Sequence, residues 1–182
     1  MHGTEAPSAW VVRWIGYPGA RVSVLDLAAG AGRHARFCAG RGFAVTAVDR
    51  DATALAALHE VAGVKVLHAD LEGAPWPFAR AAFDIIIVTN YLHRPLFGAI
   101  SDTLRAGGLL IYETFMIGNE RLGRPANPAF LLQPGELPAA FAETTRVVGF
   151  EQGRVNAPKP AVVQRFCGVR LGDASPEPEG LD

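Results

Sequence analysis

Short apolar runs alternate with amphipathic segments along the first two thirds of this 182-residue sequence. The runs are rich in Val, Leu and Ile and end at glycine or polar residues, which is typical of strands buried in a sheet. Strands and helices that alternate at this spacing predict βαβ units, and therefore a parallel sheet with right-handed crossovers. We expect five such strands, at residues 21–27, 44–48, 64–67, 83–88 and 109–113.

Helices are expected between these strands and after the last of them. Gly42 is placed to stop the first helix, and Asp51 is placed as the N-cap of the second. Gly107 and Gly108 are expected to stop the third. The four predicted helices cover residues 33–41, 52 to about 61, 93–105 and 134–141.

The last third of the chain has a different pattern. Residues 118–128 are dense in Gly, Asn and Pro and predict a long irregular loop. Two β-rich runs, 144–151 and 161–169, are separated by a turn with no room for a crossover helix, so they should pair antiparallel. The whole pattern predicts a doubly wound α/β fold with a mostly parallel seven-stranded sheet and a C-terminal antiparallel pair. We expect one domain over residues 1–172 and a disordered acidic tail at 173–182.

Composition places the chain among globular proteins, with 49% hydrophobic and 19% charged residues. A net charge of -1 lacks the cationic surplus typical of nucleic-acid binders, so such partners are not expected. No apolar run reaches the length of a membrane span, and residues 1–7 lack a signal-peptide pattern. Cys38 and Cys167 have no metal-ligand or disulfide spacing. We therefore expect reduced thiols, no metal site and a cytoplasmic location.

A glycine turn after the first strand is the strongest chemical signal. Asp26 lies within that strand, Gly30 and Gly32 follow it, and a helix begins at once. Small residues let a ligand approach the backbone, and a helix N-terminus offers unpaired N–H groups to an anionic group. Taken alone, the same pattern also fits an ordinary tight turn between a strand and a helix.

Acidic residues follow the next two strands. Asp49 ends the second strand, where a carboxylate can accept hydrogen bonds from both hydroxyls of a ribose. Asp70 follows the third strand and is placed either to meet an adenine amino group or to form a turn. Together with the glycine turn, these positions predict a nucleoside-binding edge of the sheet.

The order of these motifs resembles the class I S-adenosylmethionine-dependent methyltransferases, and most closely their small-molecule branch, which includes tellurite-resistance-type enzymes. Several motifs in the family's order are more specific than any one of them. The resemblance rests on residues 24–32 (VLDLAAGAG), 47–49 (AVD), 69–71 (ADL), 83–92 (FDIIIVTNYL) and 104–108 (LRAGG).

This resemblance implies a Rossmann-like fold, S-adenosylmethionine as cofactor, and methyl transfer to an unidentified small-molecule acceptor. It implies that the glycine turn passes under the methionine part of the cofactor and that Asp49 binds the ribose. Ala28 replaces the first glycine of the family's triplet, which is a mild change. The implied cofactor-binding residues are Asp26, Ala28, Gly30, Gly32, Asp49, Arg50, Asp70, Leu71 and Asn90.

Further polar residues at the same sheet edge are candidates for the acceptor side. Tyr91, His93 and Glu113 are candidate catalytic residues, although His93 also fits a helix residue that faces solvent. The loop at 118–128 is expected either to close the site or to pack on itself. Its polar residues and Arg94 give the substrate candidates Arg94, Asn119 and Arg124. His34 is interpreted as a helix-surface histidine.

Two alternatives remain open at this point. Residues 30–35 also satisfy the G-x-G-x-x-A fingerprint of NAD(P)-dependent oxidoreductases. Asp26 before the turn and a terminal strand pair in place of a substrate domain count against that class. A non-catalytic domain that binds the cofactor and serves a partner is the second alternative, which the intact acidic positions disfavour. The oligomeric state is not predicted.

Overall fold

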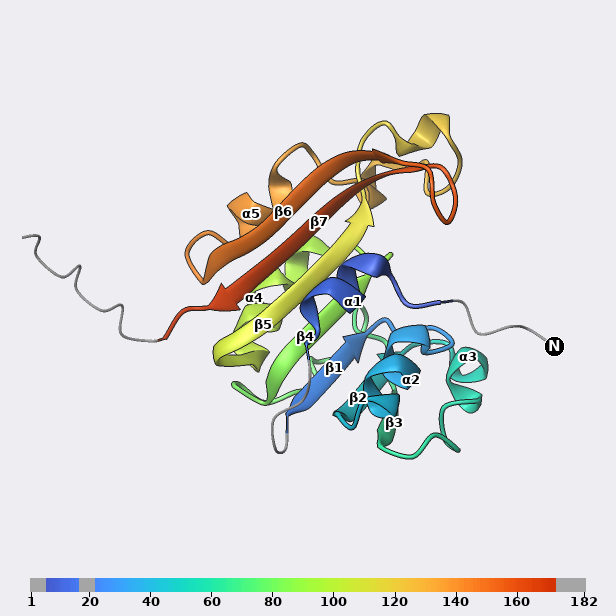
Figure 1. Ribbon diagram of the computed structural model, residues 1–182, viewed down its shortest axis with the longest axis vertical. Coiled ribbons are helices and arrows are strands. Elements are labelled where there is room, and N and C mark those ends of the chain that lie inside the picture. The colour runs from blue at the N-terminus through green and yellow to red at the C-terminus, as the bar shows by residue number, and fades with distance from the viewer. Residues whose placement is uncertain (1–5, 17–21, 173–182) are drawn as a thin grey trace, which may run out of the picture.

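A single seven-stranded sheet organises the chain in the computed structural model, which describes residues 6–16 and 22–172. The strand order is β3-β2-β1-β4-β5-β7-β6, parallel through β5, with β7 antiparallel to both β5 and β6 (Figure 1). This arrangement confirms the predicted doubly wound fold and its terminal antiparallel pair. The strands are β1 (Ser23–Leu27), β2 (Ala44–Asp49), β3 (Val64–His68), β4 (Phe83–Thr89), β5 (Leu104–Phe115), β6 (Thr145–Val155) and β7 (Ala161–Arg170).

Helices cover both faces of the sheet, which explains why the central strands are apolar on both sides. One face packs against α1, α2 and α3, and the other packs against α4 and α5. Alternate residues of β4 enter the two cores, so that Ile86 and Val88 pack on one side and Ile85 and Ile87 on the other. The helices are α1 (Ala9–Trp14), α2 (Arg33–Gly40), α3 (Ala52–Ala56), η1 (Arg94–Leu96), α4 (Phe97–Thr103), η2 (Asn119–Arg121), η3 (Pro128–Phe130) and α5 (Glu136–Ala140).

The predicted helix at 93–105 is the main error in the element assignment. The chain forms the short η1 and then α4, and β5 already begins at Leu104. Gly107 and Gly108 therefore lie inside β5, where its register with β4 shifts, and not after a helix. A Cβ on Gly108 would lie 2.8 Å from the carbonyl oxygens of Arg105 and Asp84. The glycines thus permit a strand irregularity, which the sequence pattern does not separate from a helix stop.

Other boundaries differ less. Asp51 is the predicted N-cap, since its Oδ1 accepts hydrogen bonds from the N–H groups of Thr53 and Ala54. The helix that it begins is shorter than expected and ends at Ala56. The expected start of β1 at residue 21, the tail at 173–182 and residues 1–5 lie outside the described residues.

His34 is buried, contrary to its predicted place on a helix surface. Only 1% of the residue is exposed, because it lies on the inner side of α2 against the N-terminal segment. Its Nε2 accepts a hydrogen bond from the N–H of Ser8 at 3.1 Å, and its Nδ1 lies 3.4 Å from the hydroxyl of Thr89. Burial lowers the pKa of His34 to about 3, with a smaller contribution from the charge of Arg33. The ring is therefore neutral at neutral pH and joins α1, α2 and β4.

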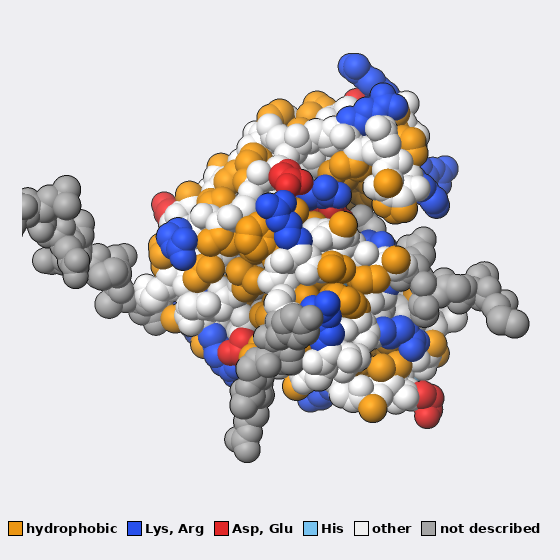
Figure 2. All heavy atoms as spheres, viewed as in Figure 1, with side chains coloured by type: hydrophobic (Ala, Val, Ile, Leu, Met, Phe, Trp, Pro, Cys, Tyr) orange, Lys and Arg blue, Asp and Glu red, His pale blue; other side chains and the backbone are white. Residues whose placement is uncertain are grey.

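The surface carries charges of both signs. On the face in Figure 2, Lys and Arg side chains lie in separate groups among apolar side chains. Among the described residues, no helix has the length and apolar character needed to cross a membrane.

Candidate functional site

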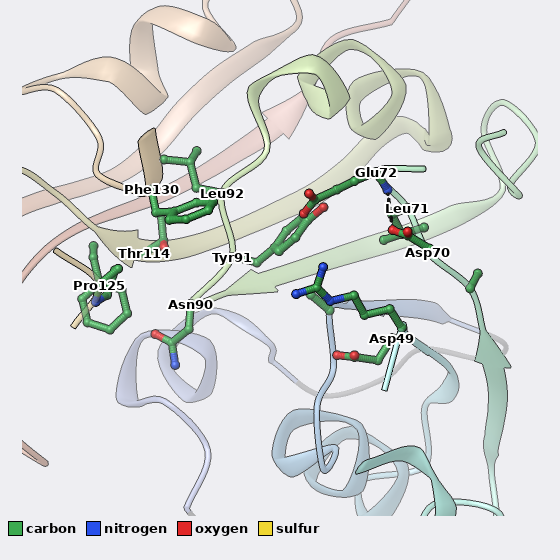
Figure 3. Close-up of a pocket in the computed structure, with 14 residues that line it drawn as sticks. Asp49, Asp70, Leu71, Glu72, Asn90, Tyr91, Leu92, Thr114, Pro125 and Phe130 are labelled. Atoms are coloured by element: carbon green, nitrogen blue, oxygen red, sulfur yellow. Dashed lines mark hydrogen bonds between the residues drawn. The ribbon is translucent and has the colours of Figure 1, made fainter. Parts of the chain in front are cut away.

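A cavity of about 380 Å³ opens at the carboxyl edge of the parallel strands (Figure 3). This is the edge where open α/β sheets bind their ligands, and the volume is in the range of small-molecule sites. The register brings the strand ends together, with Leu27 beside Val88 and Thr89 beside Glu113. The lining residues are Ala28, Asp49, Arg50, Ala69, Asp70, Leu71, Glu72, Asn90, Tyr91, Leu92, Thr114, Phe115, Pro125 and Phe130.

The glycine turn forms one wall of this cavity. Ala28, Gly30 and Gly32 all have positive φ angles, of 56°, 54° and 75°. Ala28 lines the cavity, whereas Gly32 is the N-cap of α2 and packs against Leu58. The N–H of Gly30 donates a hydrogen bond of 2.7 Å to Oδ2 of Asp49. The turn is therefore fixed to the end of β2 by a charge-assisted bond.

Asp26 connects β1 to the start of α2, next to the glycine turn. It is 1% exposed, and its Oδ2 accepts a 2.9 Å hydrogen bond from the N–H of Ala35 in α2. Burial raises the pKa of Asp26 to about 7, although the bond from Ala35 and the charge of Arg33 oppose this rise. Asp26 does not line the cavity, so its implied part in cofactor binding stays a prediction.

The acidic end of the cavity lies at the ends of β2 and β3. Asp49 and Arg50 line it from one side, and Asp70 and Leu71 from the other. Oδ1 of Asp49 accepts a hydrogen bond from the N–H of Asp51, and Oδ1 of Asp70 accepts one from the N–H of Glu72. The expected ribose and adenine residues thus face one space.

Asn90 and Tyr91 occupy the middle of the cavity. Asn90 adopts a φ of 54°, which asparagine tolerates better than most residues, and its N–H donates to the carbonyl oxygen of Glu113. The hydroxyl of Tyr91 is buried next to the carboxylate of Glu72, although the two do not meet the geometry of a regular hydrogen bond. Burial raises the pKa of Tyr91 above its usual value, and the negative charge of Glu72 and its interaction with the hydroxyl add to this rise. Tyr91 therefore lines the cavity with its hydroxyl turned to Glu72.

The other predicted catalytic residues do not line the cavity. Nδ1 of His93 lies 3.8 Å from Oε2 of Glu72, a lining residue, which places His93 at the margin. Glu113 is buried and forms an ion pair with Arg165 across β5 and β7, at 2.5 Å. Its carboxylate is thus already balanced by a cation.

Arg94 holds the segment 129–131 in place. Its guanidinium forms an ion pair with Glu136 and donates hydrogen bonds to the carbonyl oxygens of Ala129 and Leu131. These carbonyls flank Phe130, which lines the cavity. The contacts of Arg94 in the structure are those of a residue that fixes segment 129–131. A contact between Arg94 and a substrate stays a prediction.

The loop at 118–128 contributes a wall through its proline. Pro125 lines the cavity, and the Nδ2 of Asn119 donates to the carbonyl oxygen of Pro125 at 3.2 Å. Oδ1 of Asn119 accepts from the N–H of Val162 in β7, so this buried side chain ties the loop to the sheet. Arg124 is exposed and does not line the cavity, so its role toward a substrate stays a prediction.

Seven lining residues were not singled out from the sequence. Some continue motifs that were recognised: Glu72 follows Asp70 and Leu71, and Thr114 and Phe115 follow Glu113 at the end of β5. Phe130 had no such signal, because only the path of the segment brings it to the cavity. The full set is Ala69, Glu72, Leu92, Thr114, Phe115, Pro125 and Phe130.

Comparisons with known proteins identify the kind of domain that carries this cavity. Residues 24–108 match the family described as "Methyltransferase domain", which confirms the resemblance found in the motifs. A comparison with curated protein sequences found no significant match.

Solved structures of methyltransferases share the fold. A SAM-dependent methyltransferase from Methanosarcina mazei superposes with a TM-score of 0.72 at 13% identity, over 92% of this chain and 99% of that one. TehB from Haemophilus influenzae gives 0.69 at 16%, over 84% of this chain and 58% of that one. A 1,6-didemethyltoxoflavin-N1-methyltransferase from Burkholderia thailandensis gives 0.64 at 22%, over 90% and 76%. At these identities the likeness establishes the fold.

Proposed function

We propose that this chain, whose residues 24–108 match a methyltransferase domain, transfers a methyl group from S-adenosylmethionine to a small-molecule acceptor. One observation carries the proposal. A single cavity joins an acidic end at Asp49 and Asp70 to an apolar end at Pro125 and Phe130, and Asn90 lies between them. A nucleoside and a second small molecule can therefore meet in one space.

The residues at the acidic end fit the cofactor. Asp49 lines the cavity and is assigned to the ribose, and Ala28 brings the glycine turn to the cavity wall. Asp70 and Leu71, which also line it, are assigned to the adenine, and Arg50 lies in the same lining. Tyr91 and Glu72 also line this space. When bound, S-adenosylmethionine supplies a methyl group whose bond to sulfur breaks with the electron pair left on sulfur.

The protein's contribution to such a reaction is alignment. Holding two reactants in line contributes up to about 7–11 kcal/mol in favourable cases. Asn90 and Tyr91 lie where the two ends of the cavity meet, and we assign them to this positioning. A general base is needed only for an acceptor that carries a proton at neutral pH. For such an acceptor we assign this role to His93, which lies next to Glu72 at the margin of the cavity. Glu113 is not assigned to it, because its carboxylate forms an ion pair with Arg165.

Equilibrium binding tests the proposal. S-adenosylhomocysteine should bind and raise the melting temperature, because a ligand of the folded state stabilises it. NAD and NADP, the ligands of the oxidoreductase alternative, should leave the melting temperature unchanged. A stabilisation by NAD with no response to S-adenosylhomocysteine would reject the methyltransferase assignment.

The remaining expectations are part of the same proposal. We infer one domain over residues 1–172, a cytoplasmic location and no nucleic-acid substrate. On the face that Figure 2 shows, the cations lie in separate groups, and the net charge of -1 supplies no cationic surplus; both support the last point, since nucleic-acid binding favours a continuous basic surface. Salt-sensitive binding of RNA in a mobility assay would contradict it.

A further inference from the structure

The acceptor end of the cavity has an uncharged wall. Its side chains are Leu92, Thr114, Phe115, Pro125 and Phe130, and none of them carries a charge. Three of these five residues, Phe115, Pro125 and Phe130, have ring side chains, and Thr114 has a hydroxyl. This end differs sharply from the opposite one, where Asp49, Arg50, Asp70 and Glu72 line the cavity.

Two charged residues next to this wall in the chain, Glu113 and Arg94, form ion pairs outside the cavity, and Arg124, which precedes Pro125, is exposed and does not line it. Glu113 precedes Thr114 and forms its ion pair with Arg165, whose side chain is 20% exposed. Arg94 pairs with Glu136, which also accepts a hydrogen bond from the N–H of Gln133. Because no lining residue at this end carries a charge, an acceptor with a net charge would lose hydration against the wall without a counter-ion in contact with it, which is unfavourable.

Phe130 leaves an aromatic face uncovered at this end. It is 50% exposed although it lines the cavity, the largest exposure among the large hydrophobic side chains of the described residues. Arg94 holds the backbone on both sides of Phe130, because it donates hydrogen bonds to the carbonyl oxygens of Ala129 and Leu131. A half-exposed ring that lines a cavity gains stability when a second ring or apolar surface covers it.

From this wall we infer that the acceptor is a small, flat, uncharged aromatic or heteroaromatic molecule. The inference rests on the proposed methyl transfer, and it adds the chemical class of the acceptor. Phe130 and Pro125 cover the faces of the ring, and the Asn90 amide and the Thr114 hydroxyl are the polar groups available to its substituents. Phe130 is then a specificity-determining residue, because it contributes surface for the acceptor and is not one of the residues expected to bind the cofactor.

A matched pair of ligands tests the class. 2-Naphthol and 6-hydroxy-2-naphthoate share the ring system and the hydroxyl, and only the second carries a carboxylate at neutral pH. Each is titrated by calorimetry into protein saturated with S-adenosylhomocysteine. We expect 2-naphthol to bind at least tenfold more tightly, since the wall offers the carboxylate no cation. Equal or tighter binding of the carboxylate, or no binding of either compound, would overturn the inference.

Two variants locate the binding. Phe130→Ala should weaken 2-naphthol binding about tenfold, the order expected for loss of one aromatic contact, and should leave S-adenosylhomocysteine binding unchanged. Phe150→Ala is the control, because Phe150 is also an exposed phenylalanine but lies on β6 and does not line the cavity. Unchanged naphthol binding by Phe130→Ala would also overturn the inference. Failure of the wild type to bind S-adenosylhomocysteine would instead reject the proposed function.

Discussion

The carboxylate of Asp49 accepts a 2.7 Å hydrogen bond from the backbone N–H of Gly30. This bond spans the gap between the end of β2 and the turn after β1, and the same carboxylate lines the cavity. Asp49 therefore has two tasks, since it shapes the glycine turn and presents its charge to the expected ribose. The two tasks can be separated by substitution.

Asp49→Ala should weaken S-adenosylhomocysteine binding at least tenfold, because charge-assisted bonds to the ribose are lost. Asp49→Asn keeps an oxygen for Gly30 and should fall between the wild type and Asp49→Ala. Asp51→Ala is the control, since it removes a helix cap and costs about 1 kcal/mol of stability without touching the cavity. Calorimetry measures the affinities, and an unchanged affinity in Asp49→Ala would remove this residue from the cofactor site.

Gly32→Ala should destabilise the fold by about 2–4 kcal/mol, from left-handed strain and overpacking. Gly32 has a φ of 75°, and a Cβ there would lie 2.4 Å from Cδ1 of Leu58. Gly40→Ala in the same helix is the matched control, because a Cβ at Gly40 meets nothing within 4 Å. That control should gain up to about 1 kcal/mol from helix propensity. Urea unfolding separates the two, and equal stabilities would show that the turn is more tolerant than its geometry implies.

Asn119→Ala should cost about 1–3 kcal/mol, because it leaves the N–H of Val162 and the carbonyl oxygen of Pro125 without their partner. With Pro125 released, turnover should fall more than cofactor affinity, as expected for a wall that positions the acceptor. Asn127→Ala is the control, since Asn127 is exposed and accepts a bond from Ala129 in the same segment. Full activity with reduced stability in Asn119→Ala would mean that the loop only packs against the sheet.

Asp26 should make the protein less stable as the pH rises from about 4 to about 7. Its folded-state pKa of about 7 lies above the unfolded value of 3.8, so the folded state holds the proton more tightly. The penalty is absent below pH 4, grows across this interval and is complete above pH 7. Asp26→Asn keeps an acceptor for the N–H of Ala35 and should remove this pH-dependent loss of stability.

The test compares the free energies of unfolding of the wild type and Asp26→Asn at pH 5 and at pH 8. The advantage of the variant should be larger at pH 8. A difference that does not change with pH would show that Asp26 titrates alike in the folded and unfolded chain.

The sequence predicts the cofactor side of this site well because that side follows strand ends. Asp49, Asp70 and Asn90 each come directly after an apolar run, and parallel strands bring those ends to one edge. The hydrogen bond that the N–H of Gly30 donates to Asp49 was not predictable from the sequence pattern, since it depends on the shape of the turn. The same limit hid His34, whose burial comes from contacts with Ser8 in a segment that had no assigned structure.

The acceptor side was less accessible to sequence reasoning. Arg94 and Asn119 were selected as polar groups near the sheet edge, but charge and polarity alone do not distinguish a substrate contact from a residue that ties down a loop. Their partners, Glu136 and Val162, lie more than 40 positions away in the chain. Phe130 illustrates the reverse case, because an apolar residue outside regular periodicity gives no signal for a binding wall.

The two ends of the cavity come from separate stretches of the chain. The acidic end lies within residues 28–72, whereas the uncharged wall, apart from Leu92, comes from residues 114–130, beyond the matched domain that ends at residue 108. Exchange of the later stretch between relatives would thus alter the acceptor while the cofactor end is inherited intact. A chimera could join this chain, up to β5, to the later stretch of a relative, because β5 lies between β4 and β7 and contacts both halves. Such a chimera should bind the cofactor as this chain does and prefer the relative's acceptor.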